Sequence, residues 1–150
     1  MIELALAFTA HLQLAPWRAY GIRSSELRRL VEVKGGTIRG SRINGVVIPG
    51  GADWPTVYPG GVLKFDARWS FETTDGALVY VQNTGIRRAS LQIHERLDRN
   101  ELVDPKLVYF RTAPVFETAA PGYEWIAQSL FIASGRRGAN ALELDVYEVK

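Results

Sequence analysis

The sequence predicts one all-β domain, residues 1–150, folded as a closed or nearly closed antiparallel barrel of the lipocalin type with one short helix. Three observations support this: several segments alternate between apolar and polar residues, turn residues recur about every ten residues, and one segment alone has a helical pattern. A sandwich has similar features. We favour the barrel because closing the sheet removes edges that would otherwise aggregate.

The clearest strand is residues 4–14, where every even position is apolar or alanine and the side chains therefore fall on one face. Residues 63–73 show the same period, and the Asp-Gly turn in "TTDG" leads back into the next strand. The predicted strands are residues 4–14, 30–34, 37–48, 63–73, 77–82, 107–112, 123–134 and 141–149.

One stretch breaks the alternation. "RRASLQIHERLDRNELVDP" places Leu91, Ile93 and Leu97 among charged residues and contains no glycine, which predicts one short surface helix. Asp104-Pro105 ends that region.

The stretch "PGGADWP", residues 49–55, is expected to be a loop between two strands at a barrel mouth. Its prolines lack backbone donors, which is unsuited to a central strand, and its glycines permit close approaches. Asp53 would point into the opening with the indole of Trp54 beside it. The alternative is a turn in which Asp53 binds its own backbone and Trp54 closes the barrel end. Composition does not decide between them.

Composition excludes several classes of function. There is no cysteine, and two histidines make a histidine-built metal site improbable. A net charge of +2 without a basic run predicts no nucleic-acid partner. The start lacks the positive region of a signal peptide and no apolar run could cross a membrane, so we expect a cytoplasmic protein with no membrane partner.

The chain resembles the DUF3237 family, also called UPF0311, over nearly its whole length. The likeness is carried by "GGADW" (residues 50–54), by the arginine-bearing strand and the "TTDGA" hairpin after it, and by "YFRTAPVFET" and "YEWIAQSLFIASG" farther on. The family implies a compact antiparallel barrel with an internal cavity and no bound cofactor. Most members have no assigned activity, though some occur among enzymes that tailor polyketide-like and aromatic molecules.

The resemblance implies a set of site residues by position: Asp53, Arg68, Arg111 and Glu117 as catalytic candidates, and Trp54, Phe116, Tyr123 and Trp125 as substrate-binding candidates. Their chemistry is coherent. Two arginines can hold an anionic oxygen, and aromatic side chains can form flat apolar walls. A carboxyl group between such walls would have a raised pKa and could transfer a proton near neutral pH.

Structural alternatives stay open for these residues. Arg68 could instead pair with Asp66 or Glu72 on the strand surface, and Glu117 could cap backbone donors in its loop.

Tyr123 and Trp125 could be core packing. By strand periodicity they share a face with Ala127, where the family commonly has asparagine. At a second position, Gly60 stands where the family commonly has aspartate. Both changes remove polar groups, which suggests a more apolar substrate or a diverged activity.

The preferred hypothesis is a cofactor-independent cyclase, isomerase or lyase that acts by proton transfer on a hydrophobic or aromatic small molecule. Asp53 would be the acid or base, and Arg68 and Arg111 would anchor an oxygen. The alternative is a non-catalytic barrel that binds or carries such a molecule. A third is a structural subunit with a homo-oligomer interface, which predicts a filled barrel.

Overall fold

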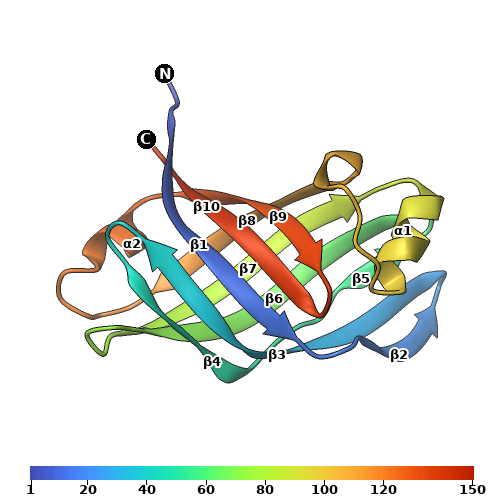
Figure 1. The fold of residues 1–150 in the computed structure, drawn as a ribbon, viewed down its shortest axis with the longest axis horizontal. Helices are drawn as coiled ribbons and strands as arrows, with labels where there is room; N and C mark the ends of the chain where they lie inside the picture. Colours follow the sequence, from blue (N-terminus) through green and yellow to red (C-terminus); the bar gives the residue numbers. More distant parts are fainter.

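The computed structural model describes residues 1–150 and shows a closed antiparallel β-barrel (Figure 1). Its strands are β1 (Leu4–Leu14), β2 (Arg18–Arg23), β3 (Glu26–Gly40), β4 (Asn44–Asp53), β5 (Thr56–Tyr58), β6 (Val62–Thr73), β7 (Leu78–Arg88), β8 (Tyr109–Glu117), β9 (Phe131–Gly138) and β10 (Ala141–Val149). Eight strands form the ring in the order β1-β10-β9-β8-β7-β6-β4-β3, and pairing of β1 with β3 closes it. The predicted fold class is confirmed.

The segment predicted to be a loop is part of the barrel wall, so that prediction was wrong. Strand β4 runs through residues 49–53 to its end at Asp53, with a bulge where its pairing with β6 passes from Ile48 to Ala52. The bulge accommodates Pro49 without a ladder hydrogen bond. Gly51 is required there, because a Cβ at this position would lie 2.5 Å from the Cβ of Trp69.

Beyond Asp53 the wall continues as β5, which takes the place of β4 between β3 and β6. The two strands are separated only by Trp54 and Pro55. Because β5 pairs with both neighbours of β4, the interruption leaves no open edge. It places Asp53, the last residue of β4, directly before the break in the wall, where it still pairs with Val31 of β3 and Ala67 of β6.

The barrel interior is filled in one half only. Around Phe116, the rings of Phe8 and Phe131 pack edge-on with centroids 5.6 and 5.2 Å away, and Phe8 also contacts Phe71. All four are almost fully buried. Burial of such large apolar side chains supplies much of the stability of the fold. The other half of the interior contains the internal pocket.

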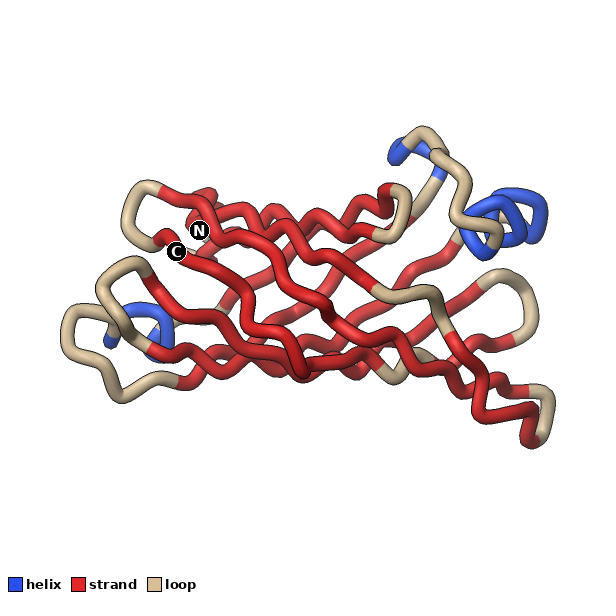
Figure 2. Tube along the Cα trace, turned by 60° about the horizontal axis from the view of Figure 1, so that its bottom comes forward, coloured by secondary structure: helices blue, strands red, loops and turns tan.

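Helices lie at the two ends of the barrel (Figures 1 and 2). The predicted surface helix is confirmed as α1 (Leu91–Asp98), capped by Ser90, whose Oγ accepts from the amide of Ile93. A one-turn 3-10 helix, η1 (Pro105–Leu107), follows it. We call the end of the barrel beside α1 the mouth.

At the opposite end lies α2 (Glu124–Gln128), in a segment for which a continuous strand, residues 123–134, was expected. That prediction was wrong in its first half, since the strand begins only at Phe131. Over five residues a single helical turn and an alternating strand give similar patterns. The turn directs Ile126, which is 1% exposed, into the core.

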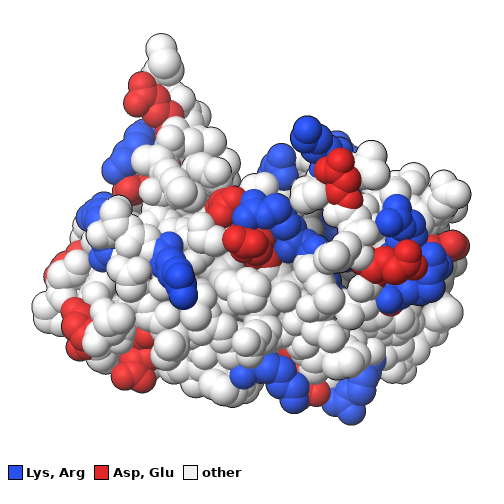
Figure 3. All heavy atoms as spheres, in the orientation of Figure 1, with Lys and Arg blue, Asp and Glu red and all other residues white.

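The visible surface carries acidic and basic side chains interspersed (Figure 3), consistent with the net charge of +2. None of the helices has both the length and the apolar character needed to cross a membrane. No three His, Cys, Asp or Glu side chains gather in a way that could hold a metal ion.

Candidate functional site

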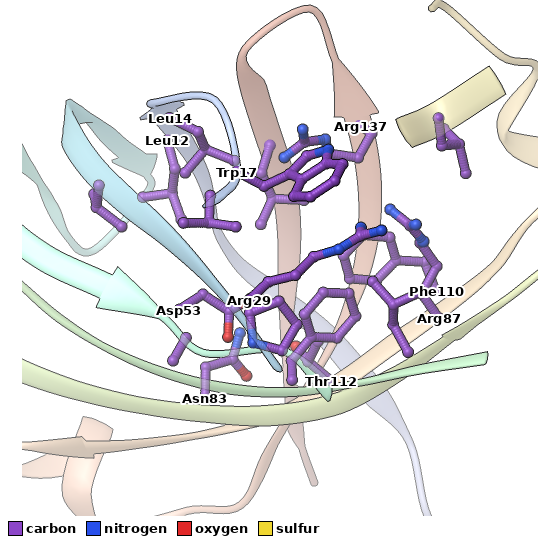
Figure 4. A pocket seen from close by; sticks show the side chains of 18 of the residues that line it. Leu12, Leu14, Trp17, Arg29, Asp53, Asn83, Arg87, Phe110, Thr112 and Arg137 are labelled. Atoms are coloured by element: carbon purple, nitrogen blue, oxygen red, sulfur yellow. The ribbon is translucent and has the colours of Figure 1, made fainter. Parts of the chain in front are cut away.

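A pocket opens into the barrel at the mouth. The volume in which the centre of a water molecule can lie inside it is about 50 Å³. That space corresponds to roughly three to five water-sized groups. Twelve of its twenty lining residues are hydrophobic. The charged and polar ones are Arg29, Asp53, Asn83, Arg87, Asp98, Thr112 and Arg137. All of these except Asp98 are labelled in Figure 4. A mostly apolar pocket with a few polar groups is the usual form of a small-molecule site.

Strand periodicity directs these side chains inward. Arg29 continues the buried face of β3 that includes Val31 and Val33, and Arg87 lies two positions beyond Gly85 on the inner face of β7. Gly135 on β9 leaves room for Phe110, because a Cβ there would lie 2.5 Å from that ring. Phe110 therefore fills the space over Gly135, and the inward positions toward the strand ends are charged.

Asp53 is the one carboxyl group deep in the pocket. Its Oδ1 accepts a hydrogen bond from the amide of Asp66 at 3.1 Å, and it makes no ion pair within 4 Å. Burial raises its pKa to about 7, with the amide bond and the charge of Arg137 opposing the rise and the charge of Asp66 adding to it. Near neutral pH the group is therefore divided between acid and carboxylate.

Asn83 and Thr112 are buried polar side chains of the pocket, and Asn83 lies beside Asp53 (Figure 4). Asn83 is 4% exposed and Thr112 5%, yet Oδ1 of the first and Oγ1 of the second have no hydrogen-bond partner in the protein. Both line the pocket. An unpaired buried polar atom costs about 1–3 kcal/mol, so two of them on one surface indicate a site that hydrogen-bonds a ligand.

Arg29 and Asp98 form the best-paired ion pair at the mouth. The two terminal nitrogens of Arg29 donate to the two carboxylate oxygens of Asp98 at 2.8 and 2.7 Å. Burial opposes ionisation of Asp98, but these bonds and the arginine charge outweigh it and lower its pKa. The guanidinium also lies 4.0 Å from the ring centroid of Trp17, whose Nε1 donates to the Asp98 carbonyl. The pair thus fastens the end of α1 over the mouth.

Arg87 and His94 complete this cluster. The Arg87 side chain approaches Asp98 at 3.8 Å and His94 at 3.4 Å. Burial, followed by repulsion from Arg137, lowers the pKa of Arg87 to about 10, so the group remains charged at neutral pH. Burial also lowers the pKa of His94, against the attraction of Asp98, which keeps this histidine neutral at pH 7.

Arg137 is the guanidinium without a protein partner. It comes from the inner face of β9, lines the pocket, and makes neither a side-chain hydrogen bond nor an ion pair. Burial lowers its pKa, and Asp53 and Asp98 oppose that change. Three arginines therefore face one ionised carboxylate, and two positive charges stay unmatched while Asp53 is protonated.

The structure brings few of the residues suggested by the sequence into this pocket. Asp53 lines it. Trp54 instead lies on the outer side of the wall, where its Nε1 donates to the hydroxyl of Tyr20 at 3.1 Å. Arg68 and Arg111 are exposed on the outer faces of β6 and β8, so the expectation that they surround Asp53 was wrong. Inner and outer positions alternate, and both arginines fall on the outer set.

The remaining four candidates lie away from the pocket. Glu117 is exposed at the end of β8, and Phe116 is packed in the filled half of the core. Tyr123 and Trp125 are half-buried at the α2 end, where the Tyr123 hydroxyl donates to Asp75 at 2.7 Å and Trp125 lies under the guanidinium of Arg42.

The two departures from the family pattern also lie away from the pocket. Ala127 is exposed on α2. The prediction that it shares a strand face with Tyr123 and Trp125 was therefore wrong. Gly60 is in the β5–β6 turn with a φ of +90°. The missing polar groups therefore do not alter the pocket lining.

Fold and pocket together define a closed antiparallel β-barrel with an internal pocket, a class compatible with small-molecule binding. The chain belongs to the family described as protein of unknown function DUF3237, whose model matches residues 2–149. It is 39% identical over 148 residues to UPF0311 protein RPA1785 of Rhodopseudomonas palustris, covering 99% of this chain and 97% of that one. UPF0311 protein blr7842 of Bradyrhizobium diazoefficiens is 43% identical over the same shares.

Solved structures show the same architecture. The crystal structure of RPA1785 matches with a TM-score of 0.94 over 100% of this chain and 98% of the other. A beta-barrel like protein of Acinetobacter baumannii, 34% identical, matches with a TM-score of 0.87 over 100% of this chain and 97% of the other. A protein described as an enzyme from Penicillium herquei, 23% identical, matches at 0.74 over 99% and 95% and shares the fold.

Proposed function

We propose that this protein is a cofactor-independent enzyme of the cyclase, isomerase or lyase type, in which Asp53 transfers a proton to or from a small, largely apolar molecule. The observation that supports it most directly is the position of Asp53: a carboxyl group with a pKa of about 7, without an ion-pair partner, on the surface of an apolar pocket. A general acid or base works best when its pKa lies near the operating pH.

The proposed step needs no other reactant. The Asp53 carboxylate takes a proton from a C–H or O–H of the substrate, and the carboxylic acid then returns it to a different atom of the same molecule. The product is a shifted double bond or a closed ring, with all atoms conserved. In a lyase reaction the electron pair of the lost C–H bond forms the new double bond, and the carboxylic acid protonates the leaving group as its bond to carbon breaks. The Thr112 hydroxyl and the amide NH2 of Asn83 would donate hydrogen bonds to the oxygen on which negative charge develops. Proton transfer by a positioned group contributes 10²–10⁴-fold, about 3–5 kcal/mol of barrier.

Deuterium exchange tests this without a known substrate. Small enolisable acids and ketones are incubated in D₂O with the protein, and incorporation is followed by NMR. We expect exchange in at least one compound and its loss by about 10²-fold or more in Asp53→Asn. Glu72→Gln, an exposed acid on the outer face of β6, is the matched control.

Two other results are informative. Exchange that is equally fast in Asp53→Asn contradicts the proposed role of Asp53. Compounds that bind in the pocket but never exchange favour the second candidate, a barrel that binds or carries its ligand. The mostly apolar pocket inside the barrel supports that candidate as well.

A further inference from the structure

We propose that the pocket takes a small, largely apolar carboxylic acid in its carboxylate form, and that Arg137 is the residue that binds the carboxylate group. This inference rests on the proposed function, because it assumes that the pocket around Asp53 is the working site. It adds the chemical class of the substrate and the residue that selects it.

The three arginines of the pocket are unevenly paired. Both terminal nitrogens of Arg29 are occupied by Asp98, while Arg87 has only longer contacts at 3.4 and 3.8 Å. Arg137 has none. Arg137 is only partly buried, so its donors remain accessible on the pocket wall and are free to bind a ligand oxygen.

The pocket as a whole carries excess positive charge. Asp98 neutralises one arginine, and the protonated form of Asp53 neutralises none. A ligand with negative charge therefore complements the pocket, and a neutral one does not. Because a carboxylate matches the planar fork of a guanidinium in a bidentate pair, it is the anion that Arg137 binds with the best geometry.

The pocket is divided into a charged mouth and a mostly apolar interior. Figure 4 shows the guanidinium groups of Arg29 and Arg87 on one side and Asp53 with Asn83 on the other. Stacked Phe65 and Phe110 rings, 4.9 Å apart, line the space with other apolar side chains. A molecule with a carboxylate at one end and an apolar body fits this division. The body reaches Asp53 while the carboxylate stays with Arg137. The small volume limits it to about one ring or a short chain.

Matched pairs of acid and amide test the inference. Acetate, benzoate and phenylacetate are titrated against acetamide, benzamide and phenylacetamide at pH 6.5, with tryptophan fluorescence as the readout because Trp17 and Trp69 line the pocket. We expect at least one carboxylate to bind tenfold or more tightly than its amide. Arg137→Met should weaken that carboxylate by about 10- to 100-fold and leave the amide unchanged. Arg39→Met, an exposed arginine on the outside of β3, is the control.

Several results would overturn the inference: equal affinity of acids and amides, no effect of Arg137→Met, no binding of any of the three carboxylates up to about 10 mM, or inorganic phosphate binding as tightly as the best carboxylate. If Arg137→Met fails to fold, as judged by circular dichroism, Arg137→Lys replaces it, since a point charge without the planar fork should still weaken carboxylates several-fold.

Failure of the proposed function gives a different pattern. In that case Asp53→Asn exchanges deuterium as fast as the unaltered protein, while carboxylates still prefer the pocket and still depend on Arg137. If the inference alone fails, Asp53→Asn abolishes exchange but acids and amides bind alike. The two proposals are therefore separated by the same set of variants.

Discussion

Asp53 and Asn83 lie on either side of Ala67, which pairs with Asp53 across β4 and β6 and with Asn83 across β6 and β7. Because alanine is too short to separate them, the carboxyl and the amide share one region of the pocket, and Figure 4 shows them side by side. This relationship joins a proton-transfer group to a buried hydrogen-bonding group. It is the geometric basis of the functional proposal.

Replacing Asp53 with asparagine should change how stability depends on pH. The pKa of the carboxyl is about 7 in the folded protein against 3.8 in its reference state. Between these values the folded protein holds a proton that the unfolded chain has released, so the free energy of unfolding falls as pH rises from about 4 to 7. Asp53→Asn removes this loss and keeps an oxygen for the Asp66 amide.

We expect the variant to gain on the order of 2–4 kcal/mol relative to the unaltered protein between pH 4 and pH 8. Urea unfolding at the two pH values measures it. A difference that is the same at both would show that Asp53 titrates normally.

Breaking the Arg29–Asp98 pair should loosen the mouth. Asp98→Asn leaves the guanidinium of Arg29, 5% exposed, with an uncompensated charge. We expect a loss of about 3 kcal/mol in the free energy of unfolding and faster hydrogen exchange in α1. The double variant Arg29→Met, Asp98→Asn should recover part of the loss. Glu95→Gln, on the exposed side of α1, is the control and should change little.

Gly135→Ala should distort the pocket wall. The added Cβ would lie 2.5 Å from the Phe110 ring, whereas at Gly138 on the same strand the nearest atom is 3.6 Å away. We expect Gly135→Ala to lower the free energy of unfolding by about 1–3 kcal/mol. It should also push Phe110 toward the pocket and weaken ligand binding there. Gly138→Ala should be close to neutral. Equal thermal stability of the two variants would contradict the close packing of Phe110 on β9.

His94 should make α1 sensitive to acid. Burial lowers the pKa of its imidazole below 6.5, so the unfolded chain takes up a proton before the folded one does, and stability is lost as pH falls through this range. The effect of His94 on the pH dependence of stability is opposite in sign to that of Asp53. It is therefore best measured in the Asp53→Asn background. We expect His94→Gln to remove the acid-dependent rise in hydrogen exchange of α1. If hydrogen exchange of α1 still rises in acid in His94→Gln, a group other than His94 is responsible.

The barrel class and most of its strands followed from alternation, since period two with frequent turns leaves few other folds. Most of the site did not follow. Predicted strands ended at Gln82 and Ser134 and began at Leu30, and the pocket arginines lie just beyond these limits. Arg29, Arg87 and Arg137 all occupy inward positions of the longer real strands.

A signal for these residues was present. Each of the three arginines continues the apolar face of its own strand, whereas Arg68 stands on the polar face of residues 63–73. An arginine in phase with buried residues at a strand end indicates a charged mouth. Asp53 was found because its glycine- and proline-rich surroundings are unusual. The partnership with Asn83 depends on register between strands, which one sequence does not contain.

The functional proposal depends on Asp53 being partly protonated at neutral pH. Titration of its side-chain carboxyl by ¹³C NMR in aspartate-labelled protein tests this most directly. The resonance is assigned by its absence in Asp53→Asn. We predict a midpoint near pH 7, moving higher in Arg137→Met because a nearby positive charge is lost. A midpoint below pH 5 would contradict the account.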